Sequence, residues 1–339
     1  MPEPVIGVDT SKLPGACTSA HGVLDLAAEL GYGGLLFRSV TELSPTLDPA
    51  ELLDVRQHAQ DLGLHLEAGI AKVNPYMTAE LPSVRDLGDG DYVRALTRML
   101  EACACAGIGN AWTATANWKR QYPGIFQYDR FRTDAPWRDQ LRAIERLLLA
   151  LRPVLAGTGI HLNVETHEEI TSFEVVRLVE AVGPDVLGIT FDVANVVVRG
   201  EDPVASARRC APYTRMSHLR DVRLTASPAG FTRYVVSCGA GVIDWPGVLA
   251  QLKTAPLGMW TIEGLEAGGG KSAKPVDHRD PRWQAGHPDL VPAELTSLLD
   301  LVETDPAAQS DLEKPGDQLD FLTQCHRFLA GHQAKGAGA

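Results

Sequence analysis

The sequence predicts an α/β protein with the fold of a (β/α)₈ TIM barrel. Short apolar runs alternate with amphipathic stretches along almost the whole chain, which is typical of a parallel sheet whose strands are joined by helices. Four successive apolar runs each end on a side chain that can bind a metal ion. Because such a barrel collects its functional residues at the C-terminal ends of its strands, both observations indicate the same fold.

The alternation places the strands and helices in order along the chain. Strands are predicted at residues 5–9, 34–39, 65–72, 110–116, 160–165, 187–192, 215–219 and 260–265, and helices at residues 20–30, 49–62, 92–105, 136–155, 172–182, 203–210 and 245–252. Gly31 and Gly63 directly follow the first two helices, where glycine commonly ends a helix. Thr171 and Glu174 have the spacing of a capping box at the start of the fifth helix.

Two segments interrupt the alternation. Residues 117–133 are rich in aromatic and basic side chains, and residues 266–292 are rich in Gly, Pro and His. They follow the fourth and eighth strands, so we expect two extended βα loops at one end of the barrel. Residues 117–133 could cover a substrate or be an ordinary surface loop. Residues 266–292 could be a lid or a partner surface. We expect residues 1–333 to form a single catalytic domain with a C-terminal helical extension, and residues 334–339 to be a disordered tail.

Composition and charge narrow the class of protein. The chain has 339 residues, 45% of them hydrophobic and 22% charged, and a net charge of −12. Nucleic acid and anionic membrane surfaces need a basic footprint, so neither is an expected partner. The six cysteines show no zinc-knuckle or CxxC spacing. The N-terminal residues lack the basic region followed by a long apolar region that is typical of a signal peptide, so we expect a reduced, cytoplasmic protein.

The four strand-end side chains are Glu165, Asp192, His218 and Glu263. Two of the gaps between them are close to one strand-plus-helix unit, and the third leaves room for an insertion. Three carboxylates and one imidazole form a ligand set that suits a divalent ion. We therefore predict one divalent ion per chain, with Mn²⁺ the first choice and Mg²⁺, Co²⁺ or Zn²⁺ as alternatives.

Other side chains are candidates for substrate contacts. Because side chains alternate along a strand, Asn163 and His167 lie on the same side as Glu165. Arg220, beyond the His218 strand end, could hold a sugar hydroxyl, although solvated charges are common there. Trp112 and Trp118 could form an aromatic substrate wall, although core packing is the more frequent use of tryptophan. The residues predicted to bind substrate are Asn163, Arg220, Trp112 and Trp118.

At these motifs the chain resembles the sugar phosphate isomerase/epimerase superfamily, the xylose isomerase-like group of TIM barrels. The segments that carry the resemblance are Asn163-Val164-Glu165-Thr166-His167, Thr190-Phe191-Asp192-Val193-Ala194-Asn195, Ser217-His218-Leu219-Arg220-Asp221, Gly239-Ala240-Gly241-Val242-Ile243-Asp244-Trp245 and Ile262-Glu263. The resemblance implies that the four strand-end residues hold the ion and that Glu165 and Glu263 also move protons. The chain departs from the pattern at Ala240, where relatives often have an acid.

The Glu165-x-His167 pair is similar to one in the catalytic subunit of bacterial C-glycoside deglycosidases. That similarity implies a general-base role for His167, a 3-oxo-glycoside substrate with an aromatic aglycone, and a small partner subunit; a homo-oligomer is the other assembly considered. The alternatives are a ketose 3-epimerase, an aldose–ketose isomerase or an inosose dehydratase. A metal-dependent endonuclease or a non-catalytic scaffold fits the charge and the complete ligand set less well.

Overall fold

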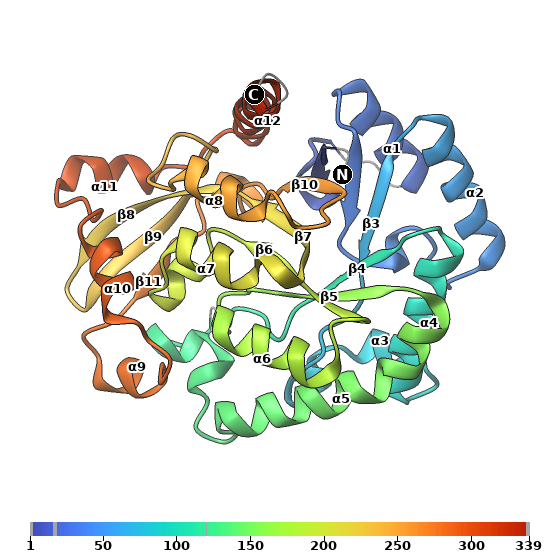
Figure 1. Ribbon diagram of the computed structural model, residues 1–339, viewed down its shortest axis with the longest axis horizontal. Helices are drawn as coiled ribbons and strands as arrows, with labels where there is room; N and C mark the ends of the chain where they lie inside the picture. Colours follow the sequence, from blue (N-terminus) through green and yellow to red (C-terminus); the bar gives the residue numbers. More distant parts are fainter. Residues whose placement is uncertain (1–2, 16–18, 120, 337–339) are drawn as a thin grey trace.

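A computed structural model describes residues 3–15, 19–119 and 121–336 of the chain. Within them, eight parallel strands close into a barrel in the order β1-β10-β7-β6-β5-β4-β3-β2 (Figure 1). The barrel strands are β1 (Val5–Asp9), β2 (Gly34–Phe37), β3 (His65–Gly69), β4 (Asn110–Thr113), β5 (His161–Glu165), β6 (Leu187–Asp192), β7 (Thr214–Leu219) and β10 (Met259–Ile262). The predicted TIM barrel is confirmed, and each of its strands overlaps a predicted one.

The helices pack around the barrel and continue past its last strand. They are α1 (Ala20–Glu29), α2 (Pro49–Asp61), α3 (Pro82–Asp86), α4 (Tyr92–Cys105), α5 (Trp137–Thr158), α6 (Ser172–Val182), α7 (Pro203–Cys210), α8 (Trp245–Leu252), α9 (Pro281–Ala285), α10 (Pro292–Leu299), α11 (Pro306–Leu312) and α12 (Gln318–Gly336). The capping box at Thr171 and Glu174 is present. Helices α10–α12 form the C-terminal extension. Helix α12 includes residues 334–336, so these are not a disordered tail, and residues 337–339 lie outside the described residues.

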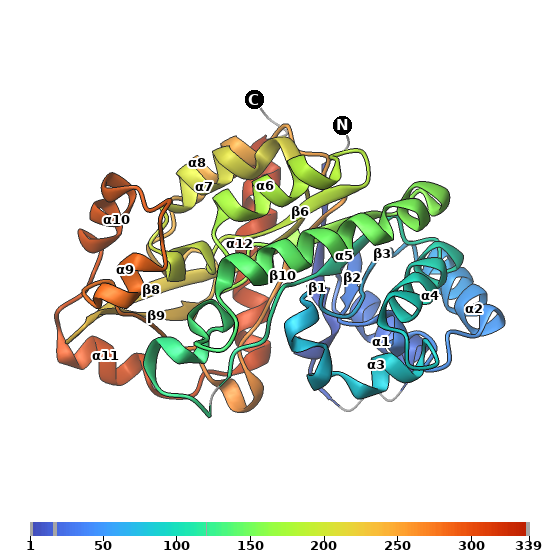
Figure 2. The ribbon, with the colours of Figure 1, turned by 90° about the horizontal axis from the view of Figure 1, so that it is seen from below.

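A second, antiparallel sheet is inserted after β7. It consists of the hairpin β8 (Asp221–Ser227) and β9 (Gly230–Val236), with β11 (Lys274–Val276) paired to β9. Figures 1 and 2 both place this sheet, with α9–α11, on the side of the barrel opposite α1–α4. The insertion fills the long gap between His218 and Glu263. The segment 266–292 is therefore not a plain loop, because it contains α9 and β11, the third strand of this sheet.

Apolar side chains fill the middle of the barrel and leave its mouth polar. One buried cluster inside the barrel joins Leu36, Trp112, Ala114, Met216 and Met259. Gly7 and Gly34 lack side chains where the Met259 sulfur approaches the neighbouring strands, and a Cβ at either position would collide with it. The larger core lies between the strands and the helices. The barrel is therefore packed rather than hollow, and only its end can hold a ligand.

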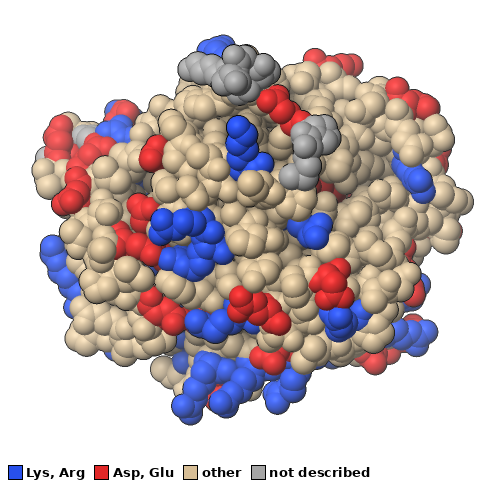
Figure 3. All heavy atoms as spheres, viewed as in Figure 1, with Lys and Arg blue, Asp and Glu red and all other residues tan. Residues whose placement is uncertain are grey.

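The described residues bear on the expectations for the cysteines, for membrane-spanning helices and for surface charge. Cys103, Cys105, Cys210, Cys238 and Cys325 are free thiols, and Cys17 lies outside the described residues. Among the helices described, none combines the length and the apolar character needed to span a bilayer. On the face in Figure 3, lysine and arginine are interspersed with aspartate and glutamate. A reduced, cytoplasmic location stays a prediction.

Candidate active site

The four predicted metal ligands meet at the mouth of the barrel. Glu165, Asp192, His218 and Glu263, here called the ligand cluster, each offer one ligand atom, and these atoms lie within 4.8 Å of one another. All four residues are buried. His218 Nδ1 lies 3.3 Å from Glu165 Oε1 and 3.6 Å from Glu263 Oε2. The structure thus brings together four side chains that are separated by almost a hundred residues of sequence.

Strand register produces this convergence. Asp192 pairs with His218 across β6 and β7, and His218 pairs with Thr261 of β10. The register between β6 and β7 shifts at Ile189/Thr190. Such an irregularity re-aims the side chains beyond it and is common next to active sites. The ends of β5, β6, β7 and β10 therefore lie at one level and direct their last side chains toward a common point.

Two arginines contact the carboxylates of the ligand cluster. Arg220 Nη2 lies 2.7 Å from Asp192 Oδ2 and 3.0 Å from Glu263 Oε2, and Arg38 Nη2 donates to Glu263 Oε1 at 2.9 Å. Burial raises the pKa of Asp192 to about 6, against the pull of Arg220, and the nearby Glu263 and Glu165 add to the rise. Burial also acts on Glu263, but Arg220 and Arg38 outweigh it and hold the pKa of that carboxyl well below its usual range.

The donor set fits a divalent cation. Taking each carboxylate out of water costs on the order of several kcal/mol unless opposite charge compensates it. Glu263 Oε2 is buried without a hydrogen bond, although Arg220 is near it. Glu165 is held in place by Trp112 Nε1, at 2.9 Å from Oε2, and by Asn195 Nδ2, at 3.1 Å from Oε1. Three positioned carboxylates and a neutral imidazole would together suit Mn²⁺, Mg²⁺, Co²⁺ or Zn²⁺.

A second acidic group lies on the loop directly after β5. Glu168 and Glu169, here called the loop pair, are buried, and each has its own partner. Arg233 Nη2 of β9 donates to Glu168 Oε1 at 2.8 Å. His167 Nδ1 lies 2.5 Å from Glu169 Oε2, and Glu169 Oε1 accepts a hydrogen bond from the Thr115 hydroxyl. Burial disfavours protonated His167, but Glu169 and Glu165 outweigh it and raise its pKa to about 9.

A cavity of about 460 Å³ covers the ligand cluster. Six of the predicted site residues line it: Trp112, Trp118, Glu165, His167, Arg220 and Glu263. Asp192 and His218 have no exposed surface and lie beneath it. Trp118 and Lys274 bring the segments 117–133 and 266–292 together above it, with the Lys274 ammonium 3.2 Å from the Trp118 ring. Both interrupting segments therefore contribute to the site.

One predicted substrate contact lies elsewhere. Asn163 points into the barrel, as its alternation with Glu165 requires, but its amide donates to Asn110, Ala111 and His161. It is fully buried and is not among the described residues that line the cavity. Asn163 is thus one layer too deep to touch a substrate, and we withdraw that assignment. Arg220 does line the cavity, but its guanidinium is already held by Asp192 and Asn195.

The departure at Ala240 does not reach the site. Ala240 is exposed and is not among the described residues of the cavity. The turn around it is fixed by Asp221, which accepts bonds from the backbone of Gly239 and Ile243 and from Trp245 Nε1. A Cβ on Gly241 would collide with Asp221 and with the backbone of Val222. This glycine-rich motif therefore shapes the entry to α8.

Residues 24–285 match the model of one protein family, described as xylose isomerase-like TIM barrel. The chain belongs to this family. The 3-oxo-isoapionate decarboxylase of Pectobacterium atrosepticum is 26% identical over 239 residues, which is 70% of this chain and 73% of that protein. The uncharacterised protein YihM of Escherichia coli is 27% identical over 115 residues, and this match spans only 35% of YihM and 34% of this chain.

Solved structures agree with the fold. The structure of an L-ribulose 3-epimerase superposes with a TM-score of 0.60 at 16% sequence identity and covers 99% of both chains. At this identity the likeness concerns the fold alone. Among its described residues, this chain has a cluster that could bind a metal ion.

Proposed function

We propose that this protein is a divalent-metal enzyme that removes a proton next to the carbonyl of a keto sugar. Its proposed substrate is a 3-oxo-glycoside, C-glycosides included, which is cleaved from its aglycone. The observation that carries the proposal is the pairing of two features in one cavity: a four-residue ligand cluster, and a histidine outside that cluster held by its own carboxylate. The 3-oxo substrate in the name of the Pectobacterium relative supports the substrate class.

The residues divide the work as follows. A divalent ion, with Mn²⁺ our first choice, would supply Lewis-acid stabilisation of the negative charge that develops on the carbonyl oxygen. His167 takes the proton from C2, next to the C3 carbonyl, while Glu169 keeps its ring oriented. The electron pair of that C–H bond becomes a C1=C2 double bond as the C1–aglycone bond breaks. The aglycone leaves with the electrons of that bond and receives the proton from His167, so the reaction is a balanced elimination.

The proposal assigns Glu165 and Glu263 to ion binding. Both are engaged by neighbouring donors, Trp112 and Asn195 for Glu165 and Arg38 for Glu263. In an epimerase they would instead carry protons on opposite faces of a free ketose. We further propose that a small partner subunit docks on residues 266–292 and raises the rate that the isolated chain shows by itself.

The test uses 4-nitrophenyl 3-oxo-β-D-glucopyranoside with the purified, Mn²⁺-loaded protein. We expect release of 4-nitrophenol, slowed when C2 carries deuterium because that bond breaks in the reaction. The matching glucoside without the oxo group should be inert, because its C2 proton is not acidic. Turnover of free ketoses with solvent deuterium appearing next to the carbonyl, abolished in Glu165→Gln and Glu263→Gln, would establish the epimerase instead.

A further inference from the structure

Arg199 is a buried arginine that forms no ion pair within the described part of the chain. It ends the short 3₁₀ helix Val196–Arg199, which follows β6, and only 1% of its surface is exposed. Its Nη1 lies 3.1 Å from His287 Nε2, whereas its Nε and Nη2 are buried without a hydrogen-bond partner. Burial lowers the pKa of Arg199 to about 10, so the side chain is still charged at neutral pH.

The groups that contact Arg199 are neutral. His287 Nδ1 lies 2.6 Å from the carbonyl oxygen of Trp283, which can only accept, so Nδ1 carries the proton and Nε2 accepts from Arg199. Burial, Arg130 and Arg199 hold the pKa of His287 well below its usual range, so the ring stays uncharged. The guanidinium carbon also lies 4.6 Å from the centre of the Tyr128 ring, whose hydroxyl is buried without a partner.

The acids of the loop pair do not neutralise Arg199. Glu168 and Glu169 act on it only at a distance. Glu168 contacts Arg233 and Glu169 contacts His167, and in the described ranges neither forms an ion pair with Arg199. A buried charge without an opposite charge beside it is strongly destabilising. A buried water molecule could accept the unpaired N–H groups, but it would leave the charge uncompensated.

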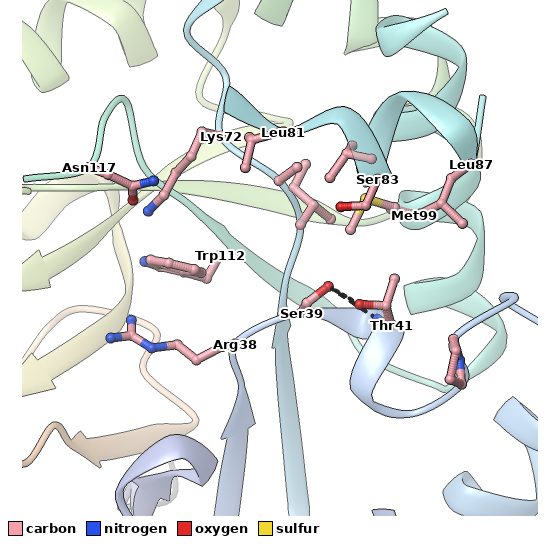
Figure 4. A pocket seen from close by; sticks show the side chains of 14 residues that line it. Arg38, Ser39, Thr41, Lys72, Leu81, Ser83, Leu87, Met99, Trp112 and Asn117 are labelled. Atoms are coloured by element: carbon pink, nitrogen blue, oxygen red, sulfur yellow. Dashed lines mark hydrogen bonds between the residues drawn. The ribbon is translucent and has the colours of Figure 1, made fainter. Parts of the chain in front are cut away.

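The two unpaired groups form one edge of the guanidinium. The Nε–H bond and one Nη2–H bond point in parallel, and this edge is the one that binds anions side by side. In Arg38, which lines the pocket drawn in Figure 4, Nε lies 2.8 Å from Asp9 Oδ2 and Nη2 lies 2.9 Å from Glu263 Oε1. In Arg199, which is more deeply buried, the same edge has no acceptor among the described residues.

We propose that Arg199 marks an internal binding site for a small monovalent anion, of which chloride is the simplest. The anion would accept both N–H groups of this edge and supply the missing negative charge. Both donor atoms are shielded from solvent, which excludes a ligand the size of a sugar. Arg199 is not among the described residues that line the cavity above the ligand cluster, so this inference does not depend on the proposed function.

The site lies where three segments of the chain meet. Arg199 follows β6, Tyr128 belongs to one of the two segments that interrupt the alternation of strands and helices, and His287 belongs to the other. The same two segments meet above the ligand cluster. A bound anion would therefore stabilise the folded protein at the segments that cover the active site.

The first test follows the melting temperature of the full chain by differential scanning calorimetry, in sodium chloride and in sodium gluconate of equal ionic strength. Gluconate is too large for the site. We expect chloride to raise the melting temperature in a saturable way, by about 2–4 °C at roughly ten times its dissociation constant. A wild type without a saturable response to chloride would contradict the site.

Two variants assign the response to Arg199. Arg199→Met removes both the charge and the donors, and should abolish the response to chloride. Arg223→Met is the matched control, because Nε and Nη2 of Arg223 already donate to the two oxygens of Glu303. Its response should equal that of the wild type. A response that is the same in Arg199→Met and the wild type, or that is lost equally in both variants, would overturn the proposal.

A crystal grown in sodium bromide locates the ion without any substitution. The proposal predicts an anomalous difference peak in contact with both Nε and Nη2 of Arg199. This result would support the site even if Arg199→Met did not fold. A water molecule at this position, or no peak there, would contradict the proposal.

Discussion

The ligand cluster and the loop pair are two groups of buried acids in one cavity, and they are neutralised in different ways. In the loop pair, Arg233 and Lys274 lie next to Glu168 and His167 lies next to Glu169, so the two carboxylates do not share a cation with each other. In the ligand cluster, Asp192 and Glu263 share Arg220, Glu263 also contacts Arg38, and Glu263 Oε2 accepts no hydrogen bond. The negative charge of the loop pair is compensated by neighbouring cations. The three crowded carboxylates of the ligand cluster share their cations, so a further cation would be stabilised there.

The difference also separates two chemical roles. Under the proposed function the ligand cluster holds the ion, and the base is a different group in the same cavity. His167 meets this requirement: it lines the cavity, its side chain is 18% exposed, and its contact is with Glu169 rather than with a ligand carboxylate. The first prediction below tests whether removing His167 spares the ion, and the second tests whether Glu169 acts through His167.

The largest of these effects is expected for His167→Ala. Loss of a general base should lower kcat/KM for the 3-oxo-glycoside by about 10²–10⁴-fold, while the metal content stays at the wild-type level. His161→Ala is the control, because His161 lies at the opposite end of the same strand. Steady-state kinetics and elemental analysis measure both quantities. Loss of the ion together with activity would mean that His167 belongs to the ligand cluster.

A smaller effect is expected for Glu169→Gln. Glu169 is a positioning residue, so we expect a fall in kcat/KM of about 10–100-fold, the range typical of a lost orienting partner. Against the effect of burial, Glu169 raises the pKa of His167. A base must be deprotonated to act, so the rising limb of the pH–rate profile should move to lower pH in the variant.

A merely structural role for Glu169 would lower activity without moving that limb. Glu201→Gln supplies the comparison: Glu201 is equally buried and contacts Ser172 and Arg209, which are not among the described residues of the cavity. A profile that moves in both variants, or in neither, would contradict the role assigned to Glu169.

Much of this site was predictable because it depends on local pattern. Each ligand follows a short apolar run, and the parallel barrel places all such positions at one end. The partners of the loop pair were not predictable in this way. Arg233 lies 65 residues from Glu168, on a hairpin whose alternation alone does not say what it packs against. The sequence also does not show how deep in the barrel a side chain lies. Asn163 was therefore predicted on the correct side of its strand but in the wrong layer of the barrel.

Measurement of bound metal tests the central claim most directly. The wild type, treated with a chelator and reloaded with Mn²⁺, should hold about one ion per chain, as its ligand set requires. Asp192→Ala and His218→Ala should hold almost none, with circular dichroism confirming that they remain folded. Glu168→Gln should match the wild type, because Glu168 is a buried acid of the same cavity with its own partner. Near-stoichiometric metal in Asp192→Ala and His218→Ala, or an equal loss in Glu168→Gln, would contradict the assignment of the ligand cluster.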